Sequence, residues 1–121
     1  MKICIPSMNP GGLDAMVSAH FGHCEVFTTV DIEGKEIKSI ETVANDAAEH
    51  DCMLPVSKLS KAKVDALLVG GIGRNPLFAL QQNGIRVYIG ATGIVRDTVK
   101  DFLNGYLRIA TIDDVCKGFC H

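Results

Sequence analysis

The segment Asp65–Gly73, DALLVGGIG, decides the fold class of this chain of 121 residues. Its aliphatic residues do not alternate with polar ones, which is typical of a parallel strand covered on both faces. The segment Ile85–Gly93, IRVYIGATG, repeats the pattern of an apolar strand that stops at a glycine-rich turn. Two such strands separated by a helix predict an α/β domain with a parallel central sheet.

Three segments nearer the amino end complete the predicted sheet, and the later two form an antiparallel hairpin. We therefore predict a mixed five-stranded sheet of order 3-2-1-4-5, with strand 2 antiparallel, right-handed crossovers and helices on both faces. The expected strands are Lys2–Pro6, Glu25–Ile32, Glu36–Ala44, Asp65–Val69 and Ile85–Ile89, and the expected helices are about Met53–Ala62, Asn75–Gln82 and Ile94–Leu103.

Composition and charge exclude several classes of protein. The chain has 14 acidic residues against 12 Lys plus Arg, a formal net charge of −2, and no basic run, which excludes nucleic-acid binding driven by phosphate neutralisation. No apolar run approaches the roughly 18 residues that a spanning helix needs, and the amino end lacks the pattern of a secretory signal. We expect a cytoplasmic protein with no membrane partner, folded as a single domain over residues 1–121 with about 106–121 as a C-terminal extension.

The predicted topology also indicates where a ligand would bind. In open α/β sheets, ligands bind outside the carboxyl ends of the strands, where the strand order reverses. Three loops should meet there: Ser7–Cys24, Gly70–Asn75 and Gly90–Gly93. The first loop is long and glycine-rich, so we expect it to be mobile or ordered by a ligand.

Glycines in the second and third loops would let backbone N–H groups approach an anion, and Arg74 would add a fixed positive charge. The alternative is a tight turn between strand and helix with no ligand. The candidate ligand-binding residues of these two loops are Gly71, Gly73, Arg74, Gly90, Thr92 and Gly93.

The stretch His20–Cys24, HFGHC, places two imidazoles and a thiol within the first loop. Imidazole and thiolate ligands suit zinc, copper, iron and iron–sulfur species. We predict His20, His23 and Cys24 as metal ligands, with Gly22 as a backbone donor beside them. In the alternative interpretation, Cys24 is a buried residue that begins the second strand and the histidines are polar surface groups. A small enzyme that uses Cys24 with His20 or His23 is a further alternative, for which no orienting residue is evident.

The other cysteines are not assigned to the site. In a reducing compartment they are expected to be thiols, metal ligands or redox groups rather than disulfides. Cys4 lies in the middle of a strand and is expected to be an inert core thiol. Asp51 is expected to cap a helix, and the tail lacks a partner pair of the C-x-x-C kind for a structural zinc site. The roles of Cys52, Cys116, Cys120 and His121 stay open.

Four segments of the chain resemble the dinitrogenase iron-molybdenum cofactor biosynthesis family. The resemblance rests on Met1–Pro6 (MKICIP), Ser18–Cys24 (SAHFGHC) followed by Phe27, Leu68–Gly73 (LVGGIG) and Val87–Gly93 (VYIGATG). It implies a ribonuclease-H-like, three-layer fold and a carrier or storage role without catalysis.

The resemblance further implies a cargo that is a metal–sulfur cluster: an iron–sulfur cluster, a molybdenum–iron–sulfur precursor, or the molybdenum–copper sulfide cluster of the related orange protein. Cluster donor and acceptor proteins would be its partners. Because such clusters are anions, hydrogen bonds from N–H groups and imidazoles could hold the sulfides, or Cys24 could supply one covalent ligand. The residues leave this choice open.

Overall fold

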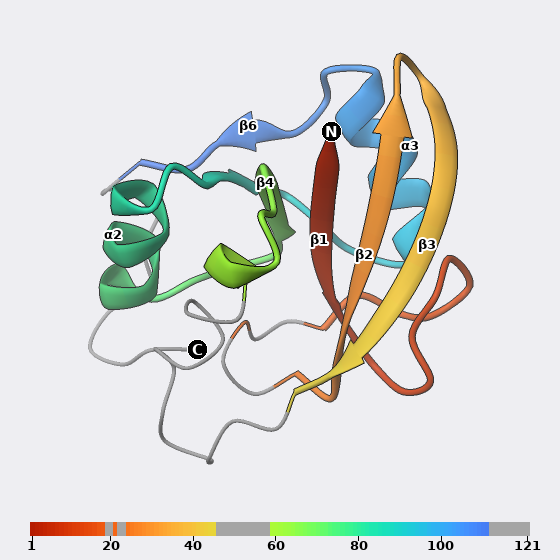
Figure 1. Cartoon of the computed structure of the whole chain (residues 1–121), viewed down its shortest axis with the longest axis horizontal. Helices are drawn as coiled ribbons and strands as arrows, with labels where there is room; N and C mark the ends of the chain where they lie inside the picture. Colours follow the sequence, from red (N-terminus) through yellow and green to blue (C-terminus); the bar gives the residue numbers. More distant parts are fainter. Residues whose placement is uncertain (19–20, 22–23, 46–58, 112–121) are drawn as a thin grey trace.

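A computed structural model describes residues 1–18, 21, 24–45 and 59–111 of the chain. The centre of the molecule is a mixed six-stranded sheet of order β3-β2-β1-β4-β5-β6 (Figure 1). The first strand is antiparallel to the second and parallel to the fourth, and the fifth continues the parallel run. The strands are β1 (Lys2–Ser7), β2 (Val26–Glu33), β3 (Glu36–Ala44), β4 (Ala66–Val69), β5 (Arg86–Ile89) and β6 (Arg108–Ile109).

The predicted strand order 3-2-1-4-5 and the antiparallel strand 2 are confirmed. The prediction of five strands is wrong, because β6 pairs antiparallel with β5 and adds a sixth strand at that edge. A strand of two residues is too short to show the period-two pattern by which strands are recognised in a sequence. The ribonuclease-H-like label stays a prediction. The predicted helix Met53–Ala62 lies largely outside the described residues, and the described residues 59–61 are helical.

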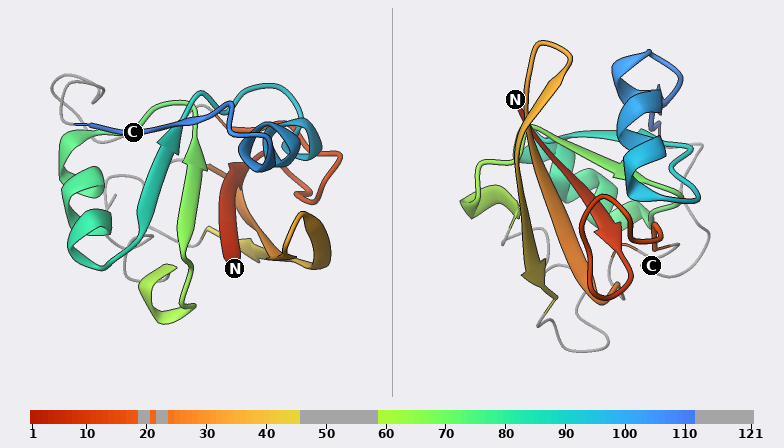
Figure 2. Two further views of the ribbon diagram at one scale, coloured as in Figure 1. Left: turned by 90° about the horizontal axis from the view of Figure 1, so that it is seen from above. Right: turned by 90° about the vertical axis from the view of Figure 1, so that its right-hand side faces the viewer.

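Two helices cover opposite faces of the sheet (Figure 2). Helix α2 (Arg74–Gln82) contributes Leu77 to a core that contains Leu67, whereas α3 (Val95–Leu103) faces a second core that contains Leu68. Because successive residues of a strand point to opposite faces, β4 supplies apolar side chains to both cores. This explains why its sequence shows no polar alternation, and it confirms the predicted helices on both faces.

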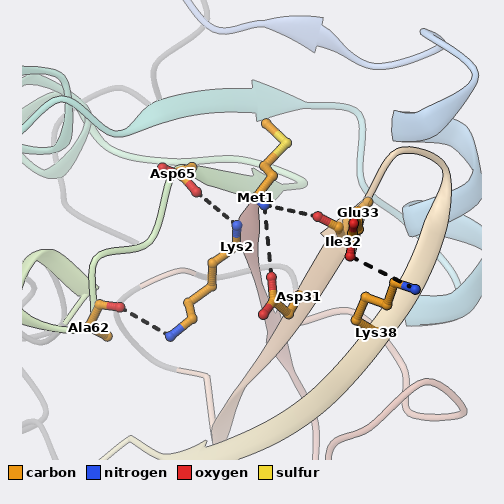
Figure 3. Close-up of polar contacts among 8 residues, drawn as sticks. All are labelled: Met1, Lys2, Asp31, Ile32, Glu33, Lys38, Ala62 and Asp65. Carbon is orange, nitrogen blue, oxygen red and sulfur yellow. Dashed lines mark hydrogen bonds and ion pairs between the residues drawn. The ribbon is translucent and has the colours of Figure 1, made fainter.

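The amino end of the chain ties β1 to both of its neighbours (Figure 3). The Met1 ammonium donates a hydrogen bond to the carbonyl of Ile32 at 2.9 Å. The backbone N–H of Lys2 donates to Oδ2 of Asp65 at 2.8 Å, and its Nζ donates to the carbonyl of Ala62 at 3.3 Å. These contacts set where β1 begins relative to β2 and β4.

Strand β3 forms one edge of the sheet, and all nine of its residues are exposed. Its register with β2 shifts between Asp31 and Ile32, which leaves Lys38 unmatched. The Nζ of Lys38 lies 3.9 Å from Glu33 and 3.7 Å from Glu36. The register of this edge strand is therefore irregular at Lys38, which carries a charged side chain.

The described part of the loop after β1, residues 8–18, is held by backbone pairing. Ser7 and Val17 form an isolated antiparallel bridge, and Met16 and Ile94 form another. The loop also approaches the sheet closely at Gly11, whose φ is +79° and at which a Cβ would lie 2.8 Å from Val26 and 2.9 Å from Thr42. Three segments distant in sequence therefore meet at this end of β1.

We expect Gly11→Ala to lower the free energy of unfolding by about 1–3 kcal/mol more than Gly12→Ala does. Both residues have positive φ, so both substitutions strain the backbone, but a Cβ at Gly12 would meet open space. Urea unfolding of the two variants measures the difference. Equal losses would mean that the loop does not pack on the sheet in solution.

Candidate functional site

A cavity of about 490 Å³ lies at the carboxyl ends of β1, β4 and β5. It is open to solvent, and residues from all three predicted loops form its wall. This is the edge at which ligands bind in open α/β sheets, because the strand order changes direction there. The wall residues are Val17, Ser18, Gly70, Gly71, Gly90, Ala91 and Thr92.

The floor of the cavity is built from closely approaching backbone. The N–H of Ala91 donates to the carbonyl of Val69 at 3.0 Å, which joins the ends of β4 and β5. A Cβ at Gly70 would lie 2.9 Å from the carbonyl oxygen of Ala91, so this approach requires glycine at that position. The two loops consequently present main-chain groups rather than bulky side chains to the cavity.

The N–H groups of Gly71 and Thr92 in the wall have no hydrogen-bond acceptor in the described part of the chain. By contrast, the N–H of Val17 donates to the carbonyl of Gly93 at 2.8 Å. Proteins commonly bind anions with unpaired N–H groups that line a concave backbone surface. The wall can therefore donate hydrogen bonds to an anionic ligand.

The two helices differ in whether the first backbone N–H groups at their amino ends are hydrogen-bonded. The first N–H groups of α3 donate to carbonyls of the loop after β1, those of Ala15 and Leu13. Helix α2 follows a cavity loop directly, and Gly73 at its N-cap gives no side-chain cap. Among the described residues, the N–H groups of Arg74 and Asn75 find no acceptor. The first N–H groups of α3 are therefore occupied by loop carbonyls, whereas no acceptor for those of α2 lies among the described residues.

Cys24 is buried in the core with Cys4 and Phe21, and only 5% of it is exposed. The amide of Asn45 donates to the Cys24 sulfur at 3.7 Å and to its carbonyl at 2.9 Å, and the N–H of Ser7 also donates to the sulfur. These donors favour the thiolate, but burial outweighs them and raises the pKa of the Cys24 thiol to about 12. The thiol is therefore protonated at neutral pH.

The structure brings together only part of the predicted site. Gly71, Gly90 and Thr92 line the cavity, whereas Cys24 does not. Gly73, Arg74 and Gly93 are close to wall residues in the chain without lining the cavity themselves. The predicted roles of His20, Gly22 and His23 fall outside the described residues, as do Asp51, Cys52, Cys116, Cys120 and His121.

The described ranges contain no group of three His, Cys, Asp or Glu side chains placed to hold a metal ion. Cys4 is fully buried, as expected for a core thiol, and burial raises its pKa well above the ordinary value. Neither buried thiol, Cys4 or Cys24, is among the described residues that line the cavity.

The sequence did not single out four of the wall residues, which contribute mainly backbone rather than reactive side chains. The sequence could have indicated two of them. Gly70 and Ala91 stand within two residues of the carboxyl ends of parallel strands, which is where ligands bind in such sheets. No such signal existed for the others, whose position depends on the bridge between Ser7 and Val17. The four are Val17, Ser18, Gly70 and Ala91.

Comparison with known proteins agrees with this architecture. The model of the dinitrogenase iron-molybdenum cofactor family matches residues 1–105. The chain belongs to this family. An uncharacterised protein of Methanocaldococcus jannaschii is 36% identical over 111 residues, which cover 89% of this chain and 90% of that protein. The family resemblance expected from the sequence is confirmed.

Solved structures of similar proteins share the fold. The apo form of the orange protein from Desulfovibrio gigas is 31% identical with a TM-score of 0.82, over 91% of this chain and 92% of that chain. A Thermotoga protein described as a candidate NifB protein is 28% identical with a TM-score of 0.78, over 97% of this chain and 98% of that chain. No helix in the described ranges is long and apolar enough to span a membrane.

We expect the buried thiols to make the protein less stable in alkali. Since burial raises the pKa of Cys4 and Cys24 in the folded state, the unfolded chain releases these protons first as the pH rises above the ordinary thiol value of 9.0. Their contribution to stability should be complete below pH 9 and decline toward pH 12. Urea unfolding at increasing pH should show a shallower decline for Cys24→Ala than for the unsubstituted protein. Parallel pH profiles would show that Cys24 is not buried as described.

Proposed function

We propose that this protein binds and carries a metal–sulfur cluster for cluster assembly, with the cluster as its cargo. The observation that carries the proposal is the open cavity, in whose wall the N–H groups of Gly71 and Thr92 meet no acceptor among the described residues. Sulfide-rich clusters are anions, and N–H groups can bond to their sulfides without displacing a metal ligand. Membership of the dinitrogenase iron-molybdenum cofactor family supports the same class of cargo.

Local donors must attract this cargo, because the formal net charge of the chain is −2 and gives no favourable overall field. Arg74 is exposed, and no carboxylate in the described part of the chain pairs with it. It stands at the first position of α2, where the positive end of the helix dipole lies. We therefore assign Arg74 and the amino end of α2 to retention of the anion.

Hydrogen bonding is the proposed principal mode of attachment. A metal could bind the Cys24 sulfur only after displacing a proton from a thiol whose pKa is about 12. Hydrogen bonds from the cavity wall need no such step, and His20 and His23 are proposed as further donors or ligands from the first loop. Iron–sulfur, molybdenum–iron–sulfur and molybdenum–copper sulfide clusters all fit this mode.

The alternative function, a small enzyme that uses Cys24 with His20 or His23, is supported less well. A nucleophilic or metal-binding cysteine needs its thiolate, and partly exposed, electropositive surroundings normally supply it. Burial of Cys24 acts in the opposite direction. We accordingly propose a non-catalytic carrier with a ribonuclease-H-like fold that exchanges its cargo with donor and acceptor proteins of the cytoplasm.

Anaerobic reconstitution tests the carrier function. Protein treated with iron and sulfide, or with tetrathiomolybdate and copper, should gain visible absorbance and stoichiometric metal after desalting. Thr92→Phe places a large ring at the cavity wall and should reduce the bound metal several-fold. Gln82→Phe, at an exposed position of α2, should not. A colourless product in both treatments contradicts the carrier function. Equal loading of the two variants places the cargo outside the cavity.

A pair of cysteine variants tests the mode of attachment. If hydrogen bonds hold the cluster, Cys24→Ser should retain as much metal as Cys4→Ser, which is the matched loss of a buried thiol from the same core. Elemental analysis and the visible spectrum of the loaded proteins give the measurement. Selective loss of metal from Cys24→Ser would instead identify Cys24 as a covalent ligand.

A further inference from the structure

Met8, Met16 and Ile94 form an exposed apolar surface, here called the Met16 patch. Their exposed fractions are 47%, 51% and 39%. Met16 and Ile94 are directly opposite each other in an antiparallel bridge, and the N–H of Met8 donates to the carbonyl of Met16 at 2.9 Å. Residues opposite each other in antiparallel pairing direct their side chains to the same face, so the side chains of Met16 and Ile94 lie together, and Met8 adjoins Met16 through its backbone.

The Met16 patch shares its backbone with the cavity wall. Val17 follows Met16 in the chain, and Thr92 precedes Ile94 by two residues, and both Val17 and Thr92 line the cavity. A molecule that covers the patch would therefore lie beside the cavity opening.

One acidic and one basic residue are near the patch in the chain, since Asp14 precedes Met16 by two residues and Arg96 follows Ile94 by two. Arg96 and Asp14 form an ion pair at 2.8 Å, and both side chains are exposed. An equal and opposite pair is complementary to a second copy of itself, because a two-fold arrangement can bring each charge close to the opposite one. The net charge of −2 adds little repulsion between copies.

We propose that the Met16 patch is the contact surface of a weak symmetric dimer, in which the occupant is a second copy of this chain. A two-fold axis near Met16 apposes the two patches, since an isologous interface uses the same surface on both subunits. Methionine side chains are flexible and polarisable, which suits a surface that must pack against itself. In this dimer the openings of the two cavities are neighbours.

The size of the patch sets the strength of the dimer. Stable dimers bury on the order of 800 Å² on each partner, which is more than three partly exposed side chains can supply. The association is therefore reversible and depends on protein concentration. It does not rest on the proposed function, because the patch is present in the chain without cargo.

Sedimentation velocity and amide NMR spectra of the reduced, cluster-free protein, from about 10 μM to about 1 mM, test the proposal. The sedimentation coefficient should rise with concentration, and the concentration-dependent amide shifts should centre on Met8, Met16 and Ile94. Met16→Glu should abolish both effects, because it apposes two carboxylates at the axis. Phe78→Glu, at an exposed apolar residue of α2, should leave both effects unchanged.

Two outcomes overturn the proposal. One is a protein that stays monomeric with unchanged spectra up to the highest concentration. The other is self-association that survives both Met16→Glu and Met8→Glu, or shift changes that centre on another surface. Circular dichroism of each variant checks that the fold is retained. Because no cluster is added, a failure of reconstitution leaves this result unaffected.

Discussion

Hydrogen bonding along both sides of β1 holds the molecule together, with an antiparallel neighbour on one side and a parallel neighbour on the other. This one strand joins the hairpin of β2 and β3 to the parallel strands β4 and β5. It also supplies Cys4 to one core and Ile3 to the other. At its carboxyl end, Ser7 pairs with Val17, which positions the loop that completes the cavity wall. The site therefore depends on the same pairing that defines the fold.

The cavity wall consists largely of main-chain groups, so the site depends more on the path of the backbone than on particular side chains. A wall of N–H groups requires a backbone path and small residues, as the close approach of Gly70 to Ala91 illustrates. It requires few particular reactive side chains. The similar orange protein, at 31% identity, retains the fold with a TM-score of 0.82. A shared backbone can thus provide similar donors even when most side chains differ.

The sequence predicted the sheet well where burial leaves a strong pattern. The apolar run of β4 identified a strand covered on both faces, and topology then placed three loops at one end. The short strand β6 was missed because two residues show no periodicity. Sequence chemistry left open whether Cys24 is a metal ligand or a buried residue, because its burial depends on Phe21 and on the distant Asn45. Ser18 was missed for a related reason, since its approach to the wall depends on pairing across the loop.

The irregular register of the edge strand β3 also affects the tendency of the protein to aggregate at high concentration. An exposed edge strand of nine residues could act as a template for a strand of another molecule, which is a route to fibrillar aggregation. The register shift near Lys38 interrupts that template, and a lysine ammonium at the interruption would have to be desolvated by any added strand. Copies of the chain can therefore meet through other surfaces without forming a continuous sheet.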